Sequence, residues 1–189
     1  MGIVGVLENS KRKYMKQKQH QLIPKILHID SRGVIVKRKS WHENKRIEER
    51  PAVMAYLDKI KYALASGQVR INFQHERRVD QQRDIKYTNR YTVQTLFPDE
   101  DAVKALKREL ATLTVEEYVE TVKDTSFPNL SEMRVFGKKY SLGEVYIKIR
   151  VELLNIASAG AHTIFVMSFH FAENDFEEEN FPYRKTRGE

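Results

Sequence analysis

The fold expected for this chain is decided by the run Glu144-Val145-Tyr146-Ile147-Lys148-Ile149-Arg150-Val151-Glu152-Leu153. Aliphatic residues occupy every second position, and the positions between them carry Tyr146, Lys148 and Arg150. A period of two is typical of a β-strand that has one face in the core. The run therefore predicts a strand with an apolar face and a basic face, and the basic face is the first candidate for function.

Three more segments have the pattern of strands. Residues 69–73 alternate apolar and polar side chains, and strands are also expected at 132–136 and 163–171. The small residues Ser158-Ala159-Gly160 separate the last two long strands and are suited to a flexible connection. These two strands are therefore expected to form an antiparallel hairpin.

Three helices are expected from spacing and capping residues. Between Pro51 and Gly67, apolar side chains recur three or four positions apart, as on one face of an amphipathic helix. Residues 99–113 show the same spacing. The box Thr114-Val115-Glu116-Glu117 predicts a third, short helix that ends near Lys123, because the threonine and the second glutamate can cap each other's backbone.

The order of these elements predicts an α+β fold. Helices come first and antiparallel strands last, so the helices should pack on one face of a small antiparallel sheet and leave the other face open. We expect residues 51–175 to form this domain. Residues 1–50 are interpreted as a basic extension that contains an arm and a small hairpin near residues 26–36, and residues 176–189 as a charged tail.

The positive charge of the chain is concentrated at its N-terminus. The net charge is +7, but residues 1–50 hold 13 Lys and Arg against 5 Asp and Glu, so the remainder is close to neutral. A basic segment attracts polyanions such as RNA without reading their sequence. A charged arm that only improves solubility fits the same composition, so both interpretations stay open.

Composition excludes several classes of protein. The chain has no cysteine, which excludes disulfides, thiolate metal sites and thiol nucleophiles and fits a reducing cytoplasm. No apolar run is long enough to span a bilayer, and the first residues lack the charged region of a signal peptide. We therefore expect a cytoplasmic protein with no membrane partner.

Four sequence blocks resemble the toxins of the motility quorum-sensing regulator (MqsR) family, and together with their spacers they cover about residues 52–172. In chain order the blocks are Ile60-Lys61-Tyr62-Ala63-Leu64-Ala65-Ser66-Gly67-Gln68-Val69-Arg70, Leu113-Thr114 with the segment to Lys123, Gly143-Glu144-Val145-Tyr146-Ile147-Lys148-Ile149, and Val166-Met167-Ser168-Phe169. The resemblance implies a RelE-like fold that cleaves mRNA without a metal or cofactor and is held inactive by a cognate antitoxin.

The resemblance also implies catalytic positions. The lysine of the family's short helix is matched by Lys123, two residues displaced, and its tyrosine is matched by Tyr146. The family's strand glutamine falls at Met133, so its role is either lost or taken by the neighbouring Arg134 as a phosphate clamp. The final lysine is replaced by His170, which titrates near neutrality and can act as an acid or base.

Further basic residues are candidates for RNA binding. Lys148 and Arg150 share the strand face of Tyr146, and Arg77 and Arg78 lie in a polar loop. A solvent-facing strand and a solvated loop show the same residues, so RNA contact and simple exposure both remain open. Whether His170 meets the face of Tyr146 depends on strand register.

The function favoured by these observations is a metal-independent mRNA endoribonuclease that acts as the toxin of a toxin–antitoxin system. Cleaving RNA in this way requires side chains that move protons and neutralise charge on the phosphate, and His, Lys, Arg and Tyr are suited to both. The alternatives are a catalytically inactive RNA- or ribosome-binding protein of the same fold, and a protein-binding regulator, such as a phage or mobile-element inhibitor, that acts through residues 1–50.

Overall fold

A computed structural model describes residues 28–29, 35–36, 43–77, 82–125, 128–153 and 161–184. The chain divides into two units, Met1–Ser40 and Trp41–Glu189. In the first unit, the strands β1 (His28–Ile29) and β2 (Ile35–Val36) pair antiparallel, which confirms the small hairpin expected there. The predicted basic arm at residues 10–21 lies outside the described residues.

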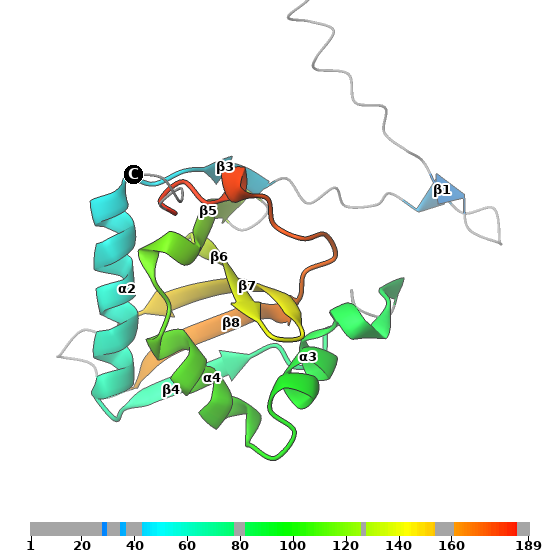
Figure 1. Ribbon diagram of the computed structural model, residues 1–189. Helices are drawn as coiled ribbons and strands as arrows, with labels where there is room; N and C mark the ends of the chain where they lie inside the picture. Colours follow the sequence, from blue (N-terminus) through cyan, green and yellow to red (C-terminus); the bar gives the residue numbers. More distant parts are fainter. Residues whose placement is uncertain are drawn as a thin grey trace, which may run out of the picture. The chain divides into compact units, whose positions relative to one another are not determined.

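The second unit is an α+β fold with one mixed sheet, as Figure 1 shows. The sheet order is β3-β5-β6-β7-β8-β4. Its strands are β3 (Glu43–Arg46), β4 (Val69–Phe73), β5 (Tyr118–Asp124), β6 (Met133–Tyr140), β7 (Gly143–Glu152) and β8 (His162–Phe171). The helices are α2 (Arg50–Ala65), α3 (Asn89–Leu96) and α4 (Ala102–Ala111), and the 3-10 turns are η2 (Ile85–Tyr87), η3 (Val115–Glu117) and η4 (Glu178–Asn180).

The sheet is not wholly antiparallel, contrary to the prediction. Strands β5 to β8 form an antiparallel meander, but β4 pairs with β8 in parallel, from Val69 opposite His162 to Phe73 opposite Val166. In Figure 1, helix α2 runs from the β3 edge of the sheet to the β4 edge, where β4 follows it in the chain. Strand β3, which comes from residues 1–50, forms the other edge by pairing with β5.

The apolar face of β7 packs under α2 and α4, as its alternation predicts. Val145, Ile147 and Ile149 are fully buried in one cluster with residues of both helices. Helix α2 ends at Ala65, and Gly67 follows with φ of +70°, a left-handed conformation that favours glycine at a helix end. The predictions for α2, α4, β4, β7 and β8 are confirmed.

Strand β5 corrects the prediction of a helix that ends near Lys123. Only the first turn is helical, where the Glu117 carboxylate accepts a hydrogen bond from the Thr114 backbone at 2.8 Å. From Tyr118 the chain is extended, because Tyr118 and Val122 are buried on opposite faces of a strand that has partners on both sides. Tertiary pairing outweighs the local helical signal here.

Helix α3, which spacing did not predict, caps part of the edge of β8. Beyond Val166, β8 has no neighbour from β4, so its backbone groups need other partners. The Asn89 side chain accepts from Phe169 N at 2.9 Å and donates to Met167 O at 3.0 Å, and Thr92 Oγ1 accepts from Phe171 N at 2.8 Å. Side chains of α3 thus supply the hydrogen bonds that a neighbouring strand would make with this part of β8.

The segment after β8 folds back on the sheet instead of forming a free charged tail. Its Phe176 and Phe181 rings lie over Gly137 of β6, where an added Cβ would approach Phe176 to 2.8 Å. The backbone N–H of Phe176 donates to Glu144 Oε2 at 2.7 Å, and Tyr183 stacks on Tyr118 at 6.1 Å. A side chain at position 137 would push this segment off the sheet.

No helix in the described part of the chain is both long and apolar enough to cross a membrane.

Candidate functional site

A bulge in β8 sets which side chains reach the open face of the sheet. Ile149 pairs with Val166 and Lys148 pairs with Ser168, so Met167 is one extra residue. Before the bulge, Ile164 and Val166 face the helices; after it, Phe169 does. Because one inserted residue reverses the alternation, Ser168 and His170 turn to the open face.

This register joins the basic face of β7 to His170. Tyr146 lies opposite His170, and Lys148 lies opposite Ser168. Opposed residues of an antiparallel pair share one face and lie within contact distance. The Tyr146 and His170 rings are stacked, with centroids 5.4 Å apart and planes 19° apart. The two faces that the sequence left unrelated therefore coincide.

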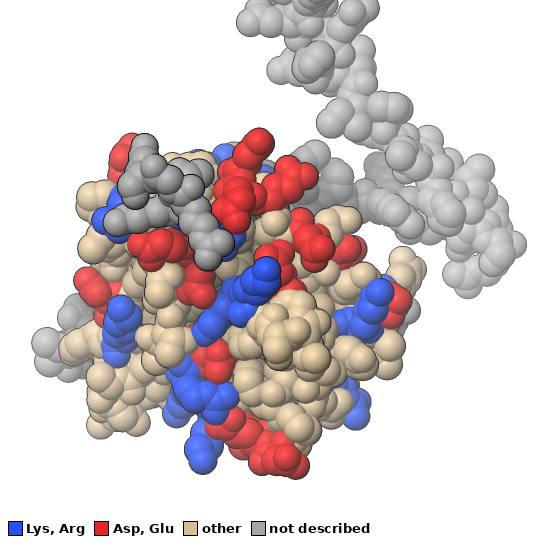
Figure 2. All heavy atoms as spheres, viewed as in Figure 1, with Lys and Arg blue, Asp and Glu red and all other residues tan. Residues whose placement is uncertain are grey.

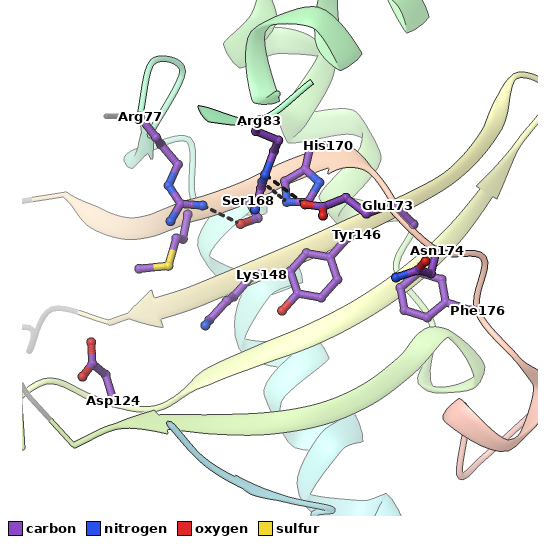
Figure 3. A pocket seen from close by; sticks show the side chains of 12 residues that line it. Arg77, Arg83, Asp124, Tyr146, Lys148, Ser168, His170, Glu173, Asn174 and Phe176 are labelled. Carbon is purple, nitrogen blue, oxygen red and sulfur yellow. Dashed lines mark hydrogen bonds and ion pairs between the residues drawn. The ribbon is translucent and has the colours of Figure 1, made fainter. Parts of the chain in front are cut away.

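These residues line a pocket of about 590 Å³ on the open face, which Figure 3 shows. Its volume is in the range of small-molecule and nucleotide sites. Two strands supply its floor, and the loop before α3 and the segment after β8 supply its walls. Its lining residues are Arg77, Arg83, Asp124, Tyr146, Lys148, Met167, Ser168, His170, Ala172, Glu173, Asn174 and Phe176.

His170 is held in one tautomer. Its Nδ1 lies 2.9 Å from the carbonyl oxygen of Phe171, which can only accept, so Nδ1 donates and Nε2 carries the lone pair of the neutral ring. The guanidinium NH1 of Arg83 donates to Nε2 at 3.3 Å. The basic nitrogen of His170 therefore points to the cationic wall of the pocket, and the residue is buried except for 6% of its surface.

Arginines from the loop before α3 form that wall. Arg83 Nε also pairs with Glu173 Oε1 at 2.9 Å, and Glu173 is 49% exposed. Arg77 NH1 donates to Ser168 Oγ at 3.1 Å. In Figure 3, Arg77, Lys148, Tyr146 and His170 border one open space. An anion in that space would meet cations from three different segments.

Four predicted site residues lie elsewhere or are not described. Lys123 is on the helix-covered side of β5 and donates to Leu130 O. Arg150 shares the face of Lys148, but it pairs with Glu152 at 2.9 Å, lies over the Phe165 ring and does not line the pocket. Arg78 lies outside the described residues. Arg134 lies on the helix side of β6, bound to Glu48.

Arg134 faces the helices and is bound there. Its NH2 donates to Glu48 Oε1 at 2.8 Å and its guanidinium lies 4.4 Å from the Tyr56 ring. Glu48 is only 5% exposed. Burial raises the pKa of Tyr56, although the charge of Arg134 opposes that shift. Arg134 therefore stabilises the domain and cannot replace the family's glutamine in the pocket, while Met133 lies on the open face in an apolar cluster with Val122.

Sequence reasoning missed Arg83, Glu173 and Phe176. Arg83 sits in the same polar run as Arg77, but nothing in its spacing points to His170. Glu173 lies at the end of the expected domain, and Phe176 begins the stretch that was interpreted as a charged tail. The aromatic residues interspersed with the acids of that stretch, Phe176 and Phe181, were the available signal for packing.

Comparisons of the chain with protein-family models, curated proteins and solved structures gave no match. Among the described residues, no group of three or more His, Asp or Glu side chains is placed to hold a metal ion.

Proposed function

We propose that this protein is an endoribonuclease that cleaves RNA by attack of a ribose 2′-hydroxyl on the adjacent phosphate. The observation that carries this proposal is the convergence of His170, Tyr146 and Lys148 with Arg77 and Arg83 in one pocket. Such cleavage needs a base, a proton donor and cations around the phosphate. The pocket supplies residue types suited to all three.

His170 is the base in this proposal. Its Nε2 lone pair takes the proton of the 2′-hydroxyl as the 2′-oxygen bonds to phosphorus, and the hydrogen bond from Nδ1 to the Phe171 carbonyl holds the ring in that tautomer. Arg83 donates to the same nitrogen while the site is empty. When the phosphate enters, Arg83 turns to its oxygens, which leaves Nε2 to the ribose.

The three cations Arg77, Arg83 and Lys148 stabilise the extra negative charge of the pentavalent phosphorane. Lys148 is 6% exposed, so its ammonium acts with little screening by water. Tyr146 donates its phenolic proton to the departing 5′-oxygen as the phosphorus–oxygen bond breaks. Figure 3 shows its hydroxyl directed toward Lys148 and away from His170, so base and acid lie on two sides of the space.

The resemblance to MqsR toxins supports a more specific form of the same proposal. It makes the α+β fold RelE-like, the substrate mRNA, the partner a cognate antitoxin and the place of action the cytoplasm. The open sheet face with the pocket, opposite α2 and α4, is in keeping with that fold. Residues 1–50 would then attract RNA or dock the antitoxin.

One observation favours a catalytically inactive RNA-binding protein instead. Met133 is apolar and Arg134 is bound to Glu48, so the position of the family's glutamine contributes no polar group to the pocket. Such a protein would bind RNA through the same cations and leave it intact.

An RNA cleavage assay with the purified chain in EDTA tests the proposal. We expect fragments that end in a 2′,3′-cyclic phosphate and a 5′-hydroxyl, and a rate about 10² to 10⁴ lower for His170→Ala. Tyr146→Phe should be slower than the wild type, and RNA with one 2′-deoxy residue should resist cleavage at that site. Intact RNA with bound protein would support the inactive alternative and overturn the enzyme.

A further inference from the structure

The segment after β8 adds a third aromatic ring to the pocket. Phe176 and Tyr146 have centroids 6.4 Å apart and planes only 5° apart, and Tyr146 is in turn stacked on His170. In Figure 3 the Phe176 ring lies next to Tyr146, on the side away from Lys148. Both rings are partly exposed and both line the pocket. They form an aromatic surface of two parallel rings next to the cations.

Phe176 is held in this position from several sides. Its backbone N–H donates to Glu144 Oε2 at 2.7 Å, and its ring packs on Phe181 at 5.4 Å and against the Cα of Gly137. A ring fixed before a ligand arrives loses little conformational entropy when the ligand stacks on it. The aromatic surface is therefore formed before a ligand binds.

We propose that Tyr146 and Phe176 form a stacking subsite for an unpaired nucleobase, a proposal that rests on the RNA cleavage proposed above. The phosphate of the same nucleotide would lie by Arg77, Arg83 and Lys148. Asn174, which lines the pocket and appears beside Phe176 in Figure 3, carries both a donor and an acceptor for a base edge.

The chemistry of these side chains favours an unpaired base as the occupant. Aromatic rings bind bases through their faces, and the adjoining arginines and lysine attract the phosphate that a base carries with it. A base within a duplex has both faces covered by its neighbours and is not accessible to such a surface. The substrate class is thus single-stranded RNA, one base of which is bound by the segment after β8.

The test measures binding of a short single-stranded 2′-O-methyl oligoribonucleotide, which lacks the attacking hydroxyl and stays intact. We expect Phe176→Leu to weaken its binding about 5- to 100-fold and Phe176→Tyr to leave it close to wild type, because only the planar ring is required. An abasic oligomer of the same length should bind Phe176→Leu as well as it binds the wild type. Tyr62→Leu, an exposed aromatic on α2, is the matched control and should bind as wild type.

A second measurement uses the unaltered protein, in case Phe176→Leu does not fold. An oligomer with 2-aminopurine should lose fluorescence when it binds, as a stacked base does, and a base-paired oligomer should bind more weakly. Equal loss of the normal and abasic oligomers in Phe176→Leu, or bound 2-aminopurine that stays bright, would overturn the subsite. If RNA is cleaved but the subsite fails, the enzyme stands; if RNA stays intact but Phe176→Leu binds weakly, only the subsite stands.

Discussion

The two faces of the sheet hold basic side chains in opposite ways. On the helix-covered face, Arg134 is bound to Glu48, a carboxylate that is 5% exposed. On the open face, Arg83 is paired with Glu173, which is 49% exposed. Breaking a pair with a buried carboxylate leaves that charge away from water without its partner, which is costly, whereas an exposed carboxylate is easily displaced by a phosphate. Basic residues at the two faces of one sheet can thus serve stability on one face and function on the other.

Basic side chains at the surface are also offset by acidic ones. On the side seen in Figure 2, which is that of Figure 1, Lys and Arg are interspersed with Asp and Glu and do not form one basic field. Paired charges also occur elsewhere among the described residues, as in Lys45 with Glu120 at 2.8 Å and Arg50 with Glu116 at 3.5 Å. Such a surface has no special attraction for RNA.

Among the variants that compare the two faces, the largest effect is expected for Lys148. Lys148→Met keeps most of the length of the side chain and removes its charge, so RNA cleavage should fall about 10² to 10³-fold while stability stays similar or rises. Cleavage rates and thermal unfolding of the two proteins would be compared. A variant that cleaves RNA as fast as the wild type would show that the pocket is not the active site.

Arg134→Met on the other face should have the reverse effect. It leaves the buried carboxylate of Glu48 without a main partner, so the free energy of unfolding should fall by about 3 kcal/mol. Cleavage per folded molecule should be unchanged. Denaturant unfolding measures the loss, and adding Glu48→Gln should recover part of it. Loss of cleavage in a fully folded Arg134→Met protein would contradict the division between the faces.

A smaller effect is expected from Glu109, which also lies on the helix side. Burial alone would raise the pKa of Glu109, but hydrogen bonds from Tyr140 and Lys138 outweigh burial and lower it below 4.5. The unfolded chain therefore takes up the proton first as pH falls, so this stability is present above pH 4.5 and is lost below it. In Glu109→Gln the free energy of unfolding should be about 1 to 2 kcal/mol lower at neutral pH and should depend less on pH in the acid range. RNA cleavage should be unchanged.

The smallest effect is expected from Lys123, which the family resemblance placed in the active site. Lys123→Met removes a surface charge that contacts the Leu130 carbonyl, so stability should change by less than about 0.5 kcal/mol and cleavage by less than about twofold. The same assays apply. A loss as large as that of Lys148→Met would move the site to the other face of β5.

Elements whose own residues fix their structure could be predicted from the sequence, and elements that depend on distant partners could not. Helix α2 and strand β7 have apolar faces that show in their own spacing, and both formed as expected. Strand β5 and helix α3 depend on partners elsewhere: β5 is extended because β3 and β6 pair with it, and α3 is placed by the unpaired edge of β8. Local patterns carry no information about such partners.

The residues of the site also divide into those that the sequence predicted and those that it did not. The family resemblance implied Tyr146 and His170, alternation added Lys148, and the polar loop supplied Arg77. The structure brings these four together. Arg83 and Phe176 come from a loop and from the segment after the last strand, where no period exists to assign a face. Their place in the pocket depends on contacts with His170 and Gly137.

By itself, the sequence determined that this protein has an α+β fold whose central strand offers one apolar and one basic face, because the period of side chains along a strand is a local property. Only the tertiary structure decided what the basic face meets. The extra residue Met167 shifts the register of β8, and that shift turns His170 toward Tyr146 and Ser168 toward Lys148. Register is set by pairing and packing between strands, so it could not be read from either strand alone.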